Sequence, residues 1–158
     1  MVALLAFSDG ESFATGLTDY NYRPATEQEL MPRIMLQVMI QGLEATAVVD
    51  TGAPYVVCTS EIARSINLDP ATSLAEIRLL IRGVSISGRL YRLPITFLAR
   101  QGDDLTVDAT AFIPNVEWEA SWGSLPSFIG LSGCLERMRF AVDPVSDTFY
   151  FGPLSADG

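Results

Sequence analysis

The chain has 158 residues, of which 49% are hydrophobic and 18% charged, a composition typical of one globular domain with a sizeable core. Its net charge of −9 comes from 19 acidic residues against 10 arginines, with no lysine and no histidine. Such an acidic balance argues against nucleic acid or an anionic membrane as a partner. The missing histidine removes the Ser-His and Cys-His nucleophile systems and most zinc sites. Any hydrolytic chemistry would therefore depend on carboxylates, and we expect no metal and no cofactor.

The start of the chain, MVALLAF, is apolar but has no basic region and no small-residue cleavage site. It therefore favours a strand over a signal peptide. No apolar run approaches the roughly 18 residues that a membrane span needs. These observations favour a cytoplasmic location.

Short β-like runs separated by Gly, Pro, Asn and Asp dominate the pattern, with little helical periodicity. Residues 8–33 are polar and turn-rich, and are expected to form irregular loop or an edge strand. Residues 34–41 and 43–49 flank Gly42 and predict a hairpin, and residues 54–58 predict a third strand.

A short helix over residues 61–68 is expected next, with Ser60 as its N-cap. Residues 75–82 and 89–99 then predict a long hairpin whose tip, residues 83–88, has a glycine at each end.

Residues 105–113 alternate enough to predict another strand, and residues 114–127 predict an ordered surface loop. A second short helix is expected around 133–138. The segments 139–143 and 148–152 then predict a closing hairpin.

Both cysteines, Cys58 and Cys134, lie in apolar stretches and are expected to be buried thiols. The sequence leaves open whether they form a disulfide. A nucleophilic Cys58 would need a base, and the chain has no histidine to supply one.

The candidate catalytic group is Asp50, within the run AVVDTGAPYVV at residues 47–57. A carboxylate between two apolar strands is costly to bury unless it is paired or hydrogen-bonded. Asp-Thr-Gly alone is a weak signal, because a strand-end turn would explain it. A second element, Phe128-Ile129-Gly130, and the glycine-tipped hairpin between the two make the combination far more specific.

Together these features resemble the pepsin–retropepsin superfamily of aspartic proteases, and specifically its single-domain, retropepsin-like type. The family's hydrophobic-hydrophobic-Asp-Thr-Gly-Ala pattern matches residues 48–53, and its later hydrophobic-hydrophobic-Gly matches residues 128–130. The closing LERMRFAVDPVSDTFYFG resembles the end of a pepsin lobe. The resemblance covers roughly residues 34–152. It implies that residues 1–158 form one all-β domain, an acid protease barrel with two short helices and a flap hairpin.

Aspartic protease chemistry needs two carboxylates that share one proton, one acting as base on a water and the other as acid on the scissile carbonyl. The chain offers one such motif. Asp9 and Asp157 lack the threonine and the buried setting, and Asp143 lies in a predicted turn. The second carboxylate would therefore come from another copy across a two-fold axis. The terminal strands MVALLAF and TFYFG are the candidates for pairing in this homodimer.

The resemblance implies a role for each residue of the motif. Asp50 would be the catalytic carboxylate, the Thr51 hydroxyl would hydrogen-bond to the partner's loop, and the Gly52 N–H would donate to the carboxylates. Pro54 departs from the family, since retroviral enzymes commonly have Asp and pepsins Ser at this position. The expected substrate-binding residues are Ala53, Gly83, Val84, Ser85, Ile86 and Ile129.

The expected function is therefore an aspartic endopeptidase that binds extended, apolar-rich peptides as an added strand, with a mildly acidic optimum. One alternative is a catalytically weak or inactive module of the same fold that dimerises or binds peptides. Another is an unrelated β-barrel with a chance Asp-Thr-Gly, which would be favoured if residues 47–57 and 128–138 lay far apart.

Overall fold

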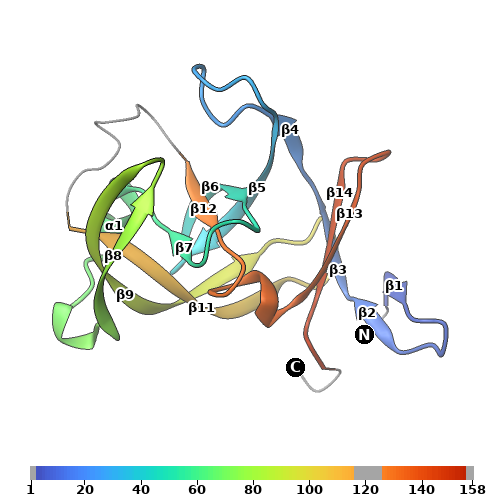
Figure 1. The fold of residues 1–158 in the computed structure, drawn as a ribbon. Coiled ribbons are helices and arrows are strands. Elements are labelled where there is room, and N and C mark those ends of the chain that lie inside the picture. Colours follow the sequence, from blue (N-terminus) through green and yellow to red (C-terminus); the bar gives the residue numbers. More distant parts are fainter. Residues whose placement is uncertain (1–2, 116–125, 156–158) are drawn as a thin grey trace.

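The central feature of the computed structural model, which describes residues 3–115 and 126–155, is a β-sheet that closes on itself (Figure 1). Its strand order is β4-β5-β6-β12-β7-β11-β9-β8. An additional antiparallel pairing of β5 with β9 closes the sheet into a barrel, from which β4 and β8 extend. The strands are β4 (Asn21–Arg23), β5 (Arg33–Ile40), β6 (Leu43–Val49), β7 (Val56–Val57), β8 (Ala75–Ile81), β9 (Val84–Phe97), β11 (Leu105–Pro114) and β12 (Ser127–Ile129). The predicted all-β class is thus confirmed.

A four-stranded sheet lies on the side of the barrel opposite the β8–β9 hairpin (Figure 1). Its order is β10-β3-β14-β13, built from β10 (Gln101–Gly102), β3 (Gly16–Asp19), β14 (Thr148–Gly152) and β13 (Arg139–Asp143). The segment TFYFG is β14, and it pairs with β13 on one edge and β3 on the other. The prediction that TFYFG pairs with a second copy is therefore wrong, because both of its edges are used within the chain.

The N-terminal segment is more regular than its polar sequence indicated. Within MVALLAF only β1 (Leu5–Ala6) is a strand, and it pairs with β2 (Ser12–Ala14). Residues 8–33, expected as irregular loop or an edge strand, contain β2, β3 and β4. Of these, β4 is an edge strand of the barrel sheet, whereas β3 lies inside the four-stranded sheet.

Two hairpins have the same tight turn. The central residues Gln41 and Gly42 join β5 to β6 with φ values of 50° and 81°, and Arg82 and Gly83 join β8 to β9 with 50° and 82°. Positive φ at both central residues is the type I′ geometry, whose twist matches that of the flanking strands. The β8–β9 pairing runs up to Ile81 opposite Val84, so the turn contains only two residues.

The expected six-residue hairpin tip at 83–88 is thus wrong, since Val84 to Gly88 belong to β9. Gly88 is needed for a different reason. A Cβ atom at Gly88 would lie 2.5 Å from the Ile113 carbonyl oxygen and 2.6 Å from the Phe112 ring, at the end of the antiparallel β9–β11 pairing, where Gly88 is opposite Pro114.

The one α-helix among the described residues is α1 (Ser60–Ile66). Its N-cap is Thr59, whose hydroxyl accepts a hydrogen bond from the Ile62 N–H at 3.3 Å, so the predicted cap at Ser60 is wrong by one residue. The second expected helix is a single 3-10 turn, η3 (Leu135–Arg137), and another such turn is η1 (Pro70–Thr72). No helix in the described part of the chain is long and apolar enough to span a membrane. The expected loop at 114–127 lies mostly outside the described residues.

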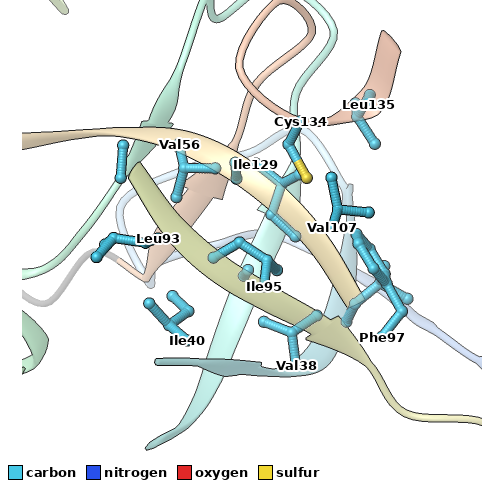
Figure 2. Packing of buried hydrophobic residues seen from close by; sticks show 14 of the residues in the cluster. Val38, Ile40, Val56, Leu93, Ile95, Phe97, Val107, Ile129, Cys134 and Leu135 are labelled. Atoms are coloured by element: carbon cyan, nitrogen blue, oxygen red, sulfur yellow. The ribbon is translucent and has the colours of Figure 1, made fainter. Parts of the chain in front are cut away.

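The barrel interior is filled by aliphatic and aromatic side chains from opposite walls (Figure 2). Phe97 stacks on Phe149 with ring centroids 6.1 Å apart, which joins the barrel core to the four-stranded sheet. Cys58 and Cys134 form no disulfide, and both are fully buried in the same cluster. Burial raises the pKa of both thiols to about 12, so they act as small hydrophobic groups.

Both thiols should therefore resist alkylation while the protein is folded. We expect no modification by iodoacetamide at pH 8 in buffer and modification of both cysteines in concentrated urea, measured by intact mass. Rapid labelling of either thiol in the folded protein would contradict the packing of this core.

Candidate active site

Asp50 stands where β6 leaves the barrel. Its backbone N–H donates to the Ile129 carbonyl at 3.0 Å, and its own carbonyl accepts from the Ala53 N–H at 3.1 Å. The Gly52 N–H donates to the Asp50 Oδ1 at 3.0 Å. These bonds fix a tight Asp-Thr-Gly turn with its carboxylate held by its own backbone.

The carboxylate is less buried than its apolar flanks indicated. Val48 is fully buried, but the Asp50 side chain is 29% exposed, and Thr51 and Gly52 are exposed. The expectation of a buried carboxylate is wrong for the single chain, because the turn projects beyond the last strand residue at the rim of the barrel.

The second motif lies directly beside this turn. β12 runs parallel to β6, with Phe128 opposite Val48 and Ile129 opposite Val49. Phe128 also pairs with Val57 of β7 on the other edge of β12. The Asp50 segment and the Phe128 segment are therefore neighbours in one sheet. The alternative of an unrelated β-barrel would have been favoured if they lay far apart, and they do not.

Two glycines let the chain after β12 cross against the Asp50 loop. A Cβ atom at Gly130 would lie 2.3 Å from the Tyr55 carbonyl oxygen, and one at Gly133 would lie 2.5 Å from the Thr110 carbonyl oxygen. The Gly133 N–H donates to the Pro54 carbonyl at 2.8 Å. The crossing segment thus holds the loop through close backbone contacts.

A pocket of about 280 Å³ opens beside the Asp50 carboxylate, and the tip of the β8–β9 hairpin forms its other wall. Of the predicted substrate-binding residues, Ala53 lines it. Gly83, Val84, Ser85 and Ile86 are not among its lining residues, and Ile129 is fully buried in the core. Ile86, expected within the hairpin tip at 83–88, is also buried. The pocket is lined by Arg33, Asp50, Gly52, Ala53, Pro54, Val57, Leu79, Leu80, Ile81, Arg82 and Phe128.

Two ion pairs at this pocket were missed from the sequence. Arg33 Nη2 lies 3.2 Å from Asp50 Oδ2. Arg82, at the hairpin tip, pairs with Glu29, whose carboxylate also accepts a hydrogen bond from the Ala25 N–H at 3.3 Å. The first pair had a usable signal, because Arg33 and Asp50 directly flank the outer ends of the two predicted hairpin strands, residues 34–41 and 43–49. The second pair, between Arg82 and Glu29, joins two segments that no sequence motif connects.

The carboxylates of two other candidate acids, Asp9 and Asp143, accept hydrogen bonds within turns. Asp9 Oδ1 accepts from the Glu11 N–H at 2.9 Å. Asp143 Oδ1 accepts from the Val145 N–H at 2.9 Å, and this bond lowers the pKa of its carboxyl. Asp157 lies outside the described residues. Within residues 3–115 and 126–155, no three His, Cys, Asp or Glu side chains gather in a way that could hold a metal ion.

Comparison with known proteins agrees with this geometry. A family model described as Aspartyl protease matches residues 36–109, just under half of the chain, which include Asp50-Thr51-Gly52 and the β8–β9 hairpin. None of the curated proteins matches in sequence.

Among solved structures, the retropepsin-like aspartic protease from Rickettsia conorii superimposes with a TM-score of 0.53 at 17% identity, covering 85% of this chain and 90% of that one. The retroviral protease-like domain of Ddi1 from Leishmania major gives 0.46 at 18% identity, covering 77% and 94%. EIAV protease with a bound inhibitor gives 0.42 at 13% identity, covering 68% and 88%. The latter two superpositions are too loose to define a fold.

The chain therefore has a retropepsin-like fold, and its resemblance to the retropepsin-like aspartic proteases is confirmed. The family match to the segment that carries Asp50 supports a protease-type function.

The crossing under the Asp50 loop should be intolerant of any side chain at Gly130. We expect Gly130→Ala to lower the free energy of unfolding by about 3 kcal/mol, because the added Cβ collides with backbone that cannot move aside. Gly10→Ala is the control, since Gly10 has a φ of 91° but no atom within 4 Å of an added Cβ. It should cost only about 1 kcal/mol, from the backbone conformation alone. Equal losses for the two variants in urea unfolding would contradict this role of Gly130.

Proposed function

We propose that the protein is an aspartic endopeptidase that works as a homodimer, with each copy contributing one Asp50 to the catalytic pair. The observation that carries this proposal is the placement of Asp50 at the mouth of a pocket, held by the Gly52 N–H and flanked by the second motif. Among the described residues that line the pocket, Asp50 is the only acid. A pair that shares one proton therefore needs a carboxylate from a second copy.

The exposure of the loop fits this assembly. Thr51, Gly52 and Pro54 are exposed in the single chain, although they follow a buried strand. A second copy facing this loop would cover these residues and bring the two carboxylates together. In that arrangement the Thr51 hydroxyl would bond to the partner's loop and hold the pair in place.

Each carboxylate would have its own part in the reaction. One Asp50, ionised, takes a proton from a water that attacks the scissile carbonyl, while the other, protonated, donates to the carbonyl oxygen. The two titrate as one unit, so activity should peak on the acid side of neutral, where the pair keeps one proton. The Gly52 N–H fixes the orientation of the carboxylate during both steps.

The β8–β9 hairpin is the proposed flap. Its residues Leu79 to Arg82 already form one wall of the pocket, and the Arg82–Glu29 pair ties the tip to the chain before β5. An extended peptide would lie between this hairpin and the Asp50 loop, where closure would exclude water. Apolar lining by Val57, Leu79 and Phe128 favours large apolar side chains around the cut.

Cleavage of a mixed peptide library between pH 4 and 7 tests the proposal, with wild type beside Asp50→Ala and the isosteric Asp50→Asn. We expect the wild type to cut and both variants to fall to background while their unfolding midpoints stay near that of the wild type. Cleavage by a pure Asp50 variant would contradict the assignment. If none of the three cuts while all remain folded, the chain is a peptide-binding or dimerisation module of this fold.

A further inference from the structure

The ion pair between Arg33 and Asp50 occupies an oxygen that the catalytic pair would need. Gly52 N–H holds Oδ1 at 3.0 Å, and Arg33 Nη2 holds Oδ2 at 3.2 Å. Both carboxylate oxygens are therefore engaged within a single chain. A second Asp50 that shares a proton with the first must approach one of these oxygens, and Oδ2 is the one held only by a side chain.

The charges at the site do not balance once two copies meet. Two carboxylates that share a proton carry one negative charge, whereas two Arg33 guanidinium groups carry two positive charges. Arg82 does not enter this sum, because it is paired with Glu29 in its own chain. No described acid other than Asp50 lines the pocket. Among the described pocket residues of two such chains, one positive charge would therefore be left without a counter-charge.

An uncompensated charge in such a place is costly. The Arg33 side chain is only 27% exposed in the single chain, and the hairpin wall of the same pocket presents Leu79, Leu80 and Ile81 beside Arg82, which is already paired with Glu29. A bound peptide and a closed hairpin would remove most of the remaining water, which raises the cost of a lone guanidinium further.

We propose that Arg33 is a specificity-determining residue that selects substrates carrying a carboxylate close to the scissile bond. This inference rests on the proposed function. Arg33 exchanges the Asp50 carboxylate for one on the substrate, and its planar guanidinium suits the two oxygens of an Asp or Glu side chain. A free peptide C-terminus offers the same chemistry. The preferred substrate is thus apolar at the cut and acidic beside it.

The test uses peptides with blocked termini, built around an apolar pair cut by the wild type, in which Glu or Gln is placed in turn at each flanking position. The same apolar peptide with a free or an amidated C-terminus distinguishes the other source of the carboxylate. At pH 6 the Glu side chain is ionised. For the wild type we expect kcat/KM to favour Glu over Gln by about tenfold or more at one position.

Three variants test whether Arg33 causes this preference for Glu over Gln. Arg33→Gln should bring the Glu-to-Gln ratio of kcat/KM close to one, and Arg33→Lys should give an intermediate ratio because it keeps the charge but loses the planar fork. Arg100→Gln is the matched control. Arg100 pairs with Asp19 on the four-stranded sheet, so its loss changes the net charge equally and should leave the ratio unchanged.

A wild type that cleaves with no preference at any position and none for a free C-terminus would overturn this inference while leaving the proposed function intact. A preference that persists in Arg33→Gln would overturn the assignment to Arg33. If the wild type cuts nothing, the proposed function fails. In that case, one blocked apolar peptide is made with Glu or with Gln in turn at each position, and its binding to Asp50→Asn is measured by fluorescence anisotropy. Tighter binding of Glu than Gln, lost in Asp50→Asn/Arg33→Gln, supports the role of Arg33, and equal binding at every position overturns it.

Discussion

The backbone contact between the Asp50 loop and the chain after β12 is the constraint on which the site depends. Parallel pairing of β12 with β6, followed by the close approach at Gly130, holds the loop against the barrel through main-chain contacts. The side chains of the loop are therefore left for other contacts. This is the physical reason why a carboxylate can stand at the end of a buried strand: its backbone is held by the core while its carboxylate stays at the rim.

The charged and polar groups around the Asp50 carboxylate determine which chemical role it can take. In a single chain it is satisfied by one N–H and one guanidinium, both from the same chain. A single carboxylate cannot act as both the base and the acid of the reaction, which needs a proton on one of two acids. The proposed homodimer changes this balance, and the same change releases Arg33 for a substrate. Catalysis and substrate selectivity would thus be coupled through Oδ2 of Asp50, which Arg33 contacts in the single chain.

Much of the fold could be predicted from the sequence, because strand alternation and glycine punctuation are local signals. The hairpin around Gly42, the helix after Thr59 and the closing hairpin follow this rule. Errors arose where neighbours in space decide the outcome. Gly88 was expected at the hairpin tip, but it lies in β9, where its missing side chain allows close contact with β11. β14 was expected to pair with a second copy, but residues 16–19 of the same chain pair with it. In the same way Ile129 belongs to the core, whereas Arg33, which showed no motif, lies at the carboxylate.

The central claim is that one active site needs Asp50 from two copies, and mixed dimers test it most directly. Wild-type chains can be unfolded and refolded together with increasing fractions of Asp50→Asn, at constant total protein. If each site uses both carboxylates, peptidase activity should fall as the square of the wild-type fraction. A fall in simple proportion to the wild-type fraction would show that each chain acts alone and would contradict the account.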